Sequence, residues 1–321
     1  MLSIVIPIYN EEGNLPALHE RIRAASAASA SWKDDYEVIL VDDGSSDRSP
    51  GLMKEMARAD SHFKVITLSR NFGHQAAISA GLKRARGSAV VIMDGDLQDP
   101  PEELDRFLEQ WRAGYDVVYA VRRKRKEPLL KRAMYAAFYR VLQLVSNIRI
   151  PLDSGDFCVM DRKVVDVLVT AFPENLRFVR GLRAYAGFRQ MGVPYERASR
   201  FAGETKYTLG KLIKLALDGI LGFSTLPLRL ATYLGFLISA VSFLVSLLYL
   251  VAKVWGIRVF GHAPGEVTGF ATLAIGMFFL AGIMLMVLGI MGEYIGLIYI
   301  EVKKRPSYII DEPRAECNDR P

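Results

Sequence analysis

The sequence contains only two cysteines, Cys158 and Cys317, among its 321 residues. Because they are few and lie far apart in the chain, a disulfide framework is unexpected and a reducing compartment fits. Charged side chains are missing from two long stretches, residues 230–252 and 268–292. An apolar content of 51% excludes a disordered or collagen-like chain.

Each uncharged stretch is long enough to cross a membrane. A helix rises about 1.5 Å per residue, so a hydrocarbon core about 30 Å thick needs about 20 residues. Basic residues flank the pair of stretches (Lys211, Lys214, Arg229, Lys303, Lys304, Arg305) and are fewer between them (Lys253, Arg258). Since basic residues concentrate on the cytoplasmic side, we predict two spans in the inner (plasma) membrane with both termini cytoplasmic.

The residues before these spans have the charge density of a soluble domain. Short β-branched apolar runs alternate with helix-length segments, which predicts a doubly wound, mostly parallel α/β sheet. The predicted strands are 3–8, 37–41, 64–68, 89–93 and 116–121, with a short one near 192–196. The predicted helices are 14–30, 47–59, 74–85, 101–112 and 129–144.

The segment before the first span is amphipathic. Between residues 209 and 223, Lys211, Lys214 and Asp218 share the face opposite the apolar residues, as in a helix at a membrane interface. A surface helix of the soluble domain is the alternative. We predict an α/β domain over 1–207, an interfacial segment over 208–227, a membrane domain over 228–300 and a cytoplasmic tail over 301–321.

The excess positive charge is concentrated in one segment. The net charge is +6, and eight basic residues face one acidic residue, Glu127, between Arg122 and Arg140. This density suits a phosphate-bearing or anionic-membrane partner. No aromatic-interleaved basic module accompanies it, so nucleic acid is not expected as a partner. For residues 123–126, a solvated surface is the alternative interpretation.

Acidic residues follow three of the predicted strands, where an open parallel sheet binds its ligands. They lie in Asn10-Glu-Glu, Asp42-Asp-Gly-Ser-Ser-Asp47 and Asp94-Gly-Asp96. The first of these turns lacks the glycines of a dinucleotide-binding loop, which disfavours a nicotinamide enzyme. The carboxylates of Asp94 and Asp96 suit Mg²⁺ or Mn²⁺, and Gln98 could add an oxygen. A turn at Asp42-Asp43-Gly44 and a helix cap at Asp47 are the structural alternatives.

Five segments together resemble the inverting glycosyltransferases of family 2, which have the GT-A fold. They are IVIPIYNEE, VDDGSSD, LSRNFGHQAA, DGDLQDPPE and RFAGETKY. The sequence is most similar to the branch that transfers a sugar from a nucleotide to a polyisoprenyl phosphate, which includes dolichol-phosphate mannose synthases and bacterial undecaprenyl-phosphate glucosyltransferases. The resemblance covers essentially the whole chain, including the two C-terminal spans.

The resemblance implies roles for individual residues. Nucleotide contacts are expected from Pro7, Tyr9, Asn10, Glu11, Asp42, Gly73 and Asp94, with Tyr9 alternatively a packing residue. Metal ligands are expected to be Asp94, Asp96 and Gln98. Contacts to the acceptor phosphate or the diphosphate are expected from Arg122, Lys131, Arg132, Arg200 and Lys206. Glu127-Pro-Leu-Leu replaces the small polar or acidic pair that the family commonly has before the Lys-Arg step.

The resemblance also implies two catalytic residues, Asp96 through the metal and Asp156, in Ser154-Gly-Asp-Phe, where such transferases place a candidate base. Because a phosphate monoester has a second pKa near 6, the acceptor is already ionised at neutral pH. Asp156 could therefore accept a proton or only orient the acceptor or a basic residue. We expect His74 to begin a helix rather than to act as a base. In-line attack would invert the anomeric centre.

The implied reaction joins glucose from UDP-glucose to undecaprenyl phosphate at the cytoplasmic membrane face. Alternatives are another donor, either a UDP-aminoarabinose derivative or GDP-mannose, and a processive polysaccharide synthase. A non-catalytic membrane scaffold would not need the acidic strand ends. Expected partners are the lipid bilayer, a downstream flippase, a second glycosyltransferase and a further copy of this chain in a homo-oligomer. The homo-oligomer is suggested by Gly292 and Gly296, a small-xxx-small pair of the kind found where membrane helices contact each other.

Overall fold

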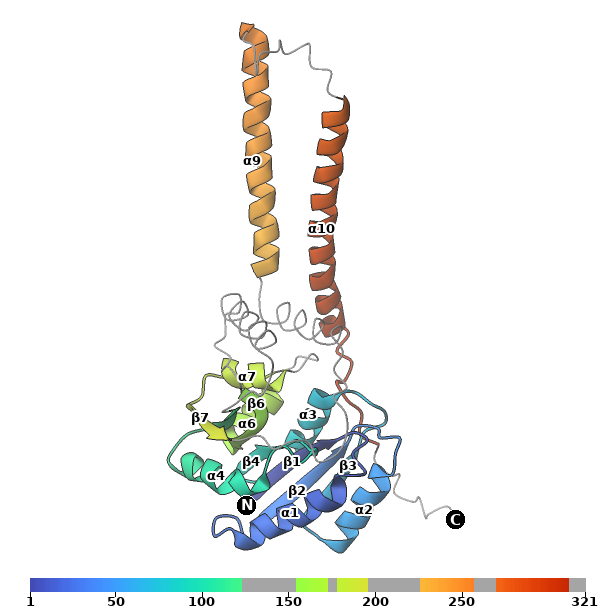
Figure 1. The fold of residues 1–321 in the computed structure, drawn as a ribbon, viewed down its shortest axis with the longest axis vertical. Coiled ribbons are helices and arrows are strands. Elements are labelled where there is room, and N and C mark those ends of the chain that lie inside the picture. The colour runs from blue at the N-terminus through green and yellow to red at the C-terminus, as the bar shows by residue number, and fades with distance from the viewer. Residues whose placement is uncertain (123–153, 173–177, 196–225, 257–269, 312–321) are drawn as a thin grey trace, which may run out of the picture. The chain divides into compact units, whose positions relative to one another are not determined.

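The computed structural model describes residues 1–122, 154–172, 178–195, 226–256 and 270–311 (Figure 1). The chain divides into two units. One contains a sheet with its helices and residues 304–311, and the other contains two long apolar helices. Several predicted features lie outside the described residues: the helices 129–144 and 209–223, and Lys131, Arg132, Arg200 and Lys206.

A seven-stranded sheet forms the centre of the first unit, with the strands in the order β3-β2-β1-β4-β6-β5-β7. The strands are β1 (Leu2–Ile8), β2 (Tyr36–Asp42), β3 (Phe63–Thr67), β4 (Ala89–Ile92), β5 (Val117–Arg122), β6 (Ser154–Asp161) and β7 (Gln190–Tyr195). All neighbouring pairs are parallel except the two that β6 makes. This arrangement confirms the predicted doubly wound, mostly parallel sheet.

β6 is absent from the strands predicted above. It runs antiparallel between β4 and β5, with Ile92 opposite Cys158 and Val121 opposite Ser154. Its first residues, Ser154-Gly-Asp156, have low intrinsic strand preference, so pairing on both sides decides their conformation. Because β6 runs against its neighbours, its beginning lies at the edge of the sheet where β4 and β5 end.

Helices cover both faces of the sheet. One face packs against α1 (Leu15–Ala28), α2 (Ser49–Ala59) and α4 (Leu104–Arg112), the last preceded by the 3₁₀ turn η1 (Pro101–Glu103). The other packs against α3 (His74–Arg84), α6 (Arg162–Thr170) and α7 (Val179–Tyr185). Neighbouring residues of the central strand β1 serve opposite faces, since Ile4 belongs to the first core and Val5 to the second. Burying each such side chain contributes about 1.5–3 kcal/mol.

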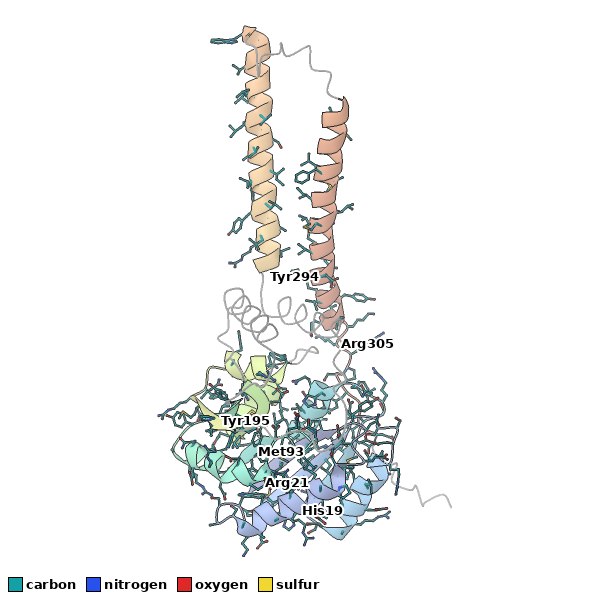
Figure 2. All side chains as sticks on the ribbon, in the orientation of Figure 1. His19, Arg21, Met93, Tyr195, Tyr294 and Arg305 are labelled. Carbon is teal, nitrogen blue, oxygen red and sulfur yellow. The ribbon has the colours of Figure 1, made fainter. Side chains whose placement is uncertain are left out.

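The second unit contains α9 (Leu226–Trp255) and α10 (Phe270–Val302). Segments of both, Leu228–Val245 and Phe279–Val302, are long and apolar enough to cross a membrane. Their large apolar side chains project outward, as Figure 2 shows, and Phe236 is 72% exposed. These helices are the two candidate membrane spans.

The second candidate span extends beyond the predicted limit at residue 292. Helix α10 continues through Gly292 and Glu293 to Val302. The predicted limit was placed at residue 292 because the next residue, Glu293, is charged. A single glutamate ends an uncharged stretch but does not break a helix. The predicted tail over residues 301–321 therefore begins inside α10.

Candidate active site

The loops that follow β1 and β2 are hydrogen-bonded to each other. The backbone N–H of Asn10 donates to Ser45 Oγ over 3.1 Å, and the Ser46 N–H donates to Asn10 Oδ1 over 2.8 Å. Glu11 N–H donates to Ser49 Oγ. The predicted nucleotide-binding residues that follow β1 are therefore held beside the loop that follows β2. Tyr9, which directly follows β1, is 43% exposed and available for contact with a ligand.

Two adjacent aspartates at the end of β2 have different partners. Asp42 is buried and accepts a hydrogen bond from the Ser45 N–H at 2.9 Å, so the predicted turn is present. Asp43 accepts hydrogen bonds from the N–H groups of Phe72 and Gly73 at 2.7 and 3.0 Å. Burial raises the pKa of Asp43 even though these N–H groups act to lower it. Asp43 thus fixes the loop before α3, a role that the sequence pattern did not reveal.

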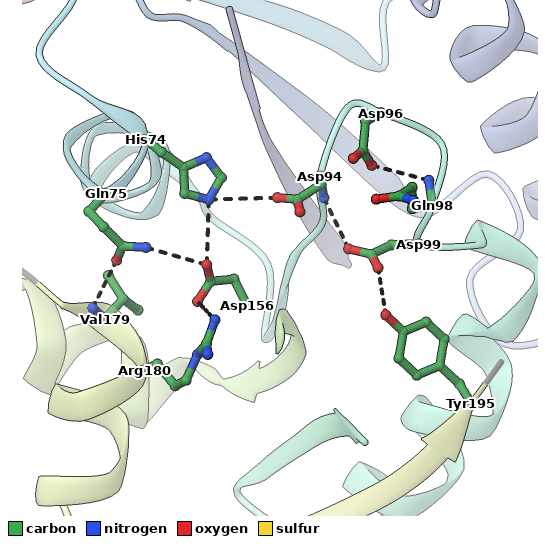
Figure 3. Close-up of polar contacts among 10 residues, drawn as sticks. All are labelled: His74, Gln75, Asp94, Asp96, Gln98, Asp99, Asp156, Val179, Arg180 and Tyr195. Atoms are coloured by element: carbon green, nitrogen blue, oxygen red, sulfur yellow. Dashed lines mark hydrogen bonds and ion pairs between the residues drawn. The ribbon is translucent and has the colours of Figure 1, made fainter. Parts of the chain in front are cut away.

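The residues after β4 form a tight acidic turn (Figure 3). Asp96 Oδ1 accepts a hydrogen bond from the Gln98 N–H at 3.1 Å, and Asp96 is only 8% exposed. Asp99 stabilises the turn, because its carboxylate accepts hydrogen bonds from the Asp94 N–H and the Tyr195 hydroxyl. Asp94 and Asp96 are therefore held by the backbone and by a buried partner.

Gly95, between the two carboxylates, lies directly against β1. A Cβ atom at this position would lie 2.5 Å from Ile8 Cδ1. The close approach brings Asp94 and Asp96 beside the end of β1.

The acidic turn has the chemistry of a divalent-cation site. Among the described residues, no three histidine, cysteine or acidic side chains come together as a complete metal cage. Mg²⁺ and Mn²⁺ do not require one, since one or two carboxylates, substrate phosphates and water satisfy them. The hard oxygens of Asp94 and Asp96 on a supported turn fit such an ion, with Gln98 next to them (Figure 3).

Asp156 lies in a network of polar side chains from three elements (Figure 3). Arg180 of α7 donates to Asp156 Oδ1 over 3.2 Å, and Gln75 of α3 donates to Oδ2 over 3.4 Å. His74 Nε2 lies 3.5 Å from Asp156 Oδ2 and 3.6 Å from Asp94 Oδ1. His74 begins α3, as predicted, and its ring also lies between the acidic turn and Asp156.

The charges in this network shift the pKa values of its members. Burial would raise the pKa of Asp156, but the charge of Arg180 and the hydrogen bond to His74 lower it well below its ordinary value. For His74, burial acts to lower the pKa, yet the hydrogen bond to Asp156 and the charge of Asp94 raise it. Asp156 is therefore an anion at neutral pH and a weak proton acceptor.

The structure brings most of the predicted site residues to one edge of the sheet. Strands β1, β2, β4 and β5 end there, and Arg122 is the last residue of β5, opposite Tyr195. Sequence reasoning missed Gln75, Arg180 and Asp99. Arg180 belongs to the site only because α7 brings it to β6, and no local sequence motif identifies it.

Comparison with known proteins identifies the family. Residues 3–169 match the model of glycosyl transferase family 2. An uncharacterized glycosyltransferase, YkcC of Bacillus subtilis, is 45% identical over 99% of this chain and 95% of its own length. A prophage bactoprenol glucosyl transferase homolog of Escherichia coli is 37% identical over 96% of this chain and 98% of its own.

A phage protein is similar to the same extent. The bactoprenol glucosyl transferase of Shigella phage SfII is 37% identical over 96% of this chain and 97% of its own length. These matches, together with the mixed sheet and the two apolar C-terminal helices, confirm the expected GT-A-type fold and its enzyme class. The chain belongs to glycosyl transferase family 2 and is a glycosyltransferase.

Proposed function

We propose that this glycosyltransferase transfers glucose from UDP-glucose to undecaprenyl phosphate at the cytoplasmic face of the membrane, with inversion and with Mg²⁺ or Mn²⁺. The polyprenyl acceptor and the glucose are supported by near-full-length similarity to proteins named bactoprenol glucosyl transferase. The observation that carries the proposal is the common location of the acidic turn, Asp156 and the end of β1 at one edge of the sheet.

The acidic turn is the proposed site for the diphosphate of the donor. Asp94 and Asp96 would hold the divalent cation, which when bound stabilises negative charge on the departing nucleoside diphosphate. The loops after β1 and β2 would bind the nucleoside through Pro7, Tyr9, Asn10, Glu11 and Asp42. Gly73 lies on the loop that Asp43 holds, close to this region.

Asp156 is proposed to orient the acceptor rather than to remove a proton from it. Its lowered pKa makes it a weak base, and a lipid phosphate with a second pKa near 6 needs no base at neutral pH. By fixing Arg180 and His74, the carboxylate would keep cationic groups beside the position where two anionic substrates meet. Arg122, Lys131, Arg132, Arg200 and Lys206 are the further proposed contacts of the phosphates.

The location at the membrane follows from the two apolar helices and the charge pattern. We propose the division into 1–207, 208–227, 228–300 and 301–321 as catalytic, interfacial, membrane and tail segments, with α10 continuing two residues into the tail and with both termini cytoplasmic. The homo-oligomer, the flippase and the second glycosyltransferase stay predictions.

The donor can be identified with the purified full-length protein and undecaprenyl phosphate in detergent. Labelled UDP-glucose, a UDP-aminoarabinose derivative and GDP-mannose are supplied separately, and the lipid product is separated and weighed by mass spectrometry. We expect label from UDP-glucose only, one hexose on each lipid, and loss of labelling in excess chelator that either cation reverses. Label from another donor would correct the sugar, and a polymer would indicate a processive synthase.

Replacing Asp96 tests the acidic turn. We expect Asp96→Ala to lower the rate of lipid labelling by at least about a hundredfold, because it removes a ligand of the charge-stabilising cation. The control is Asp166→Ala, which removes an aspartate from the exposed face of α6. Both variants should insert into membranes as the wild type does. Wild-type turnover by Asp96→Ala would refute the assignment of the metal ligand.

A further inference from the structure

The residues after α10 return to the sheet and pair with its edge. Leu68 and Ile310 form an antiparallel bridge, with the Ser69 N–H donating to the Ile309 carbonyl and the Asp311 N–H to the Thr67 carbonyl. These hydrogen bonds are 2.9 and 2.8 Å long. Because β3 is the outermost strand, residues 308–311, here named the return strand, extend the sheet at its edge.

The return strand has an inner and an outer side. Tyr308 and Ile310 pack against the second core, the one covered by α3, α6 and α7. Leu68 and Phe72 belong to the same group of apolar side chains. Ile309, between the two inward residues, is 51% exposed. The alternation is that of a strand with one buried face. The side chain of Ile310 therefore contacts the core, whereas the side chain of Ile309 does not.

The segment that the return strand holds leads directly into the candidate active site. Thr67 and Ser69 are paired with it, and the following backbone supplies the N–H groups of Phe72 and Gly73 that bind Asp43. The same segment touches the turn at the end of β2. A Cβ atom on Gly44 would lie 2.6 Å from the backbone of Arg70 and Asn71.

The loop 70–73 is therefore fixed at both ends. On one side it contacts the turn at the end of β2, and on the other it continues from residues that are bonded to the return strand. Only residues 303–307 separate the return strand from the end of α10. The position of this loop thus depends on a segment that directly follows the second candidate span.

We propose that the return strand is a positioning element of the donor site: by pairing with β3, residues 308–311 hold the loop 70–73 in the conformation that binds the nucleoside diphosphate. The inference rests on the proposed nucleotide site. The residues after α10 thereby take part in substrate binding. Ile310 does not touch the donor but helps to hold Phe72 and, through it, the loop that is bonded to Asp43.

Two pairs of variants of the full-length protein separate this role from unspecific damage. Ile310→Ser removes the inward contact, and Ile309→Ser makes the same change on the exposed side. Asp311→Pro removes the N–H that donates to Thr67, whereas Asp311→Ala keeps it. If Ile310→Ser fails to fold, Asp311→Pro still tests the pairing without altering the core.

Three measurements are made in detergent with Mg²⁺: the affinity for UDP, the exchange of amide hydrogens in a peptide covering residues 69–75, and the KM of each substrate. We expect Ile310→Ser and Asp311→Pro to weaken UDP binding by about 2- to 30-fold, the range usual for indirect coupling. Amide exchange at Phe72 and Gly73 should become faster and the donor KM should rise, while the acceptor KM stays unchanged. Ile309→Ser and Asp311→Ala should behave as the wild type.

The outcomes distinguish this inference from the proposed function. Unchanged amide exchange and unchanged UDP affinity in both Ile310→Ser and Asp311→Pro would overturn the role of the return strand. Equal effects in the control variants would also overturn it. If the wild type itself did not bind UDP, the proposed donor would be wrong, and amide exchange would still show whether the return strand fixes the loop.

Discussion

Asp156 is an anion that the fold holds between Arg180 and His74. Its position depends on three elements, since Arg180 belongs to α7, His74 to α3 and Asp156 itself to β6. Against the effect of burial, the charge of Arg180 and the contact with His74 lower the pKa of Asp156, and Asp156 and Asp94 in turn raise the pKa of His74. A carboxylate in this environment positions cations better than it accepts protons.

Replacing Arg180 tests this interpretation. We expect Arg180→Gln to lower kcat by about 10- to 100-fold, the value of one charge-assisted hydrogen bond. Removing the cation raises the pKa of Asp156, so this carboxylate gains a proton at a higher pH than in the wild type. The titration of the Asp156 carboxyl in the protein without acceptor should therefore move to higher pH, and Arg180→Lys should restore part of the shift.

The comparison between variants is essential in this experiment. The acceptor phosphate itself ionises near pH 6 and gives an acidic limb in every variant. Because this limb of the kcat profile would mask a carboxyl that titrates at lower pH, the ionisation of Asp156 is followed directly, by the ¹³C chemical shift of its carboxyl in the protein without acceptor. Superimposable carboxyl titrations for the wild type and Arg180→Gln would show that Arg180 does not control the ionisation of Asp156.

At the scale of single residues, the sequence predicted the carboxylates and missed their partners. Asp94 and Asp96 could be found because they directly follow an apolar run, which places them at a strand end. Arg180 could not be found, because its contact with Asp156 exists only when α7 packs on β6. For Asp43 the sequence offered a turn with Gly44 as a structural alternative, and its hydrogen bonds go instead to a loop about thirty residues further along the chain.

At the scale of elements, the strands that alternate with helices were predicted nearly to their ends. Strands β1, β2 and β4 are buried along their whole lengths and are mostly apolar, which is typical of strands buried on both faces. The exception, β6, contains glycine and aspartate near its start and depends on its two neighbours. The position of Asp156 level with the acidic turn follows from this antiparallel insertion, and local sequence patterns do not encode it.

Replacing each of two glycines in neighbouring segments by alanine should change the stability of the protein in opposite directions. Gly44 has φ of +68° and lies against the backbone of Arg70 and Asn71, so Gly44→Ala should destabilise the protein by at least about 1–3 kcal/mol. Gly51 lies in α2 with open space around it, so Gly51→Ala should stabilise it by about 0.5–1 kcal/mol. Thermal unfolding of the full-length protein in detergent measures both changes.

The two changes should also differ in their effect on binding. Because Gly44 touches the loop 70–73, its replacement should weaken UDP binding, whereas Gly51→Ala should leave the affinity unchanged. Equal stability of the two variants would show that the β2 turn tolerates a side chain, contrary to the contact distance in the structure.

At the scale of the whole molecule, two segments of α9 and α10 have apolar surfaces that water does not favour. The segments Leu228–Val245 and Phe279–Val302 are predominantly apolar, and almost none of their residues are buried. Exposed apolar surface of this extent marks an interaction with lipid or with another protein. The distribution of basic residues around these helices leads us to expect lipid, with both chain ends on the cytoplasmic side.

Thiol labelling tests this arrangement. Cys158 is buried in the sheet, so Cys317 is the native site for a membrane-impermeant maleimide. We expect Cys317 to react only after the membrane is permeabilised. In a Cys317→Ser background, Ala263→Cys, between the two helices, should react in intact cells. Labelling of Cys317 in intact cells would place the C-terminus on the opposite side.

Pairing at the edge of the sheet also bears on solubility. An outermost strand with bare N–H and carbonyl groups is a template for pairing with other chains, and proteins commonly cover or interrupt such edges. Residues 308–311 occupy part of this edge at the end of β3. A protein shortened before Ser307 would leave these backbone groups open, and self-association through β3 would then compete with its correct folding.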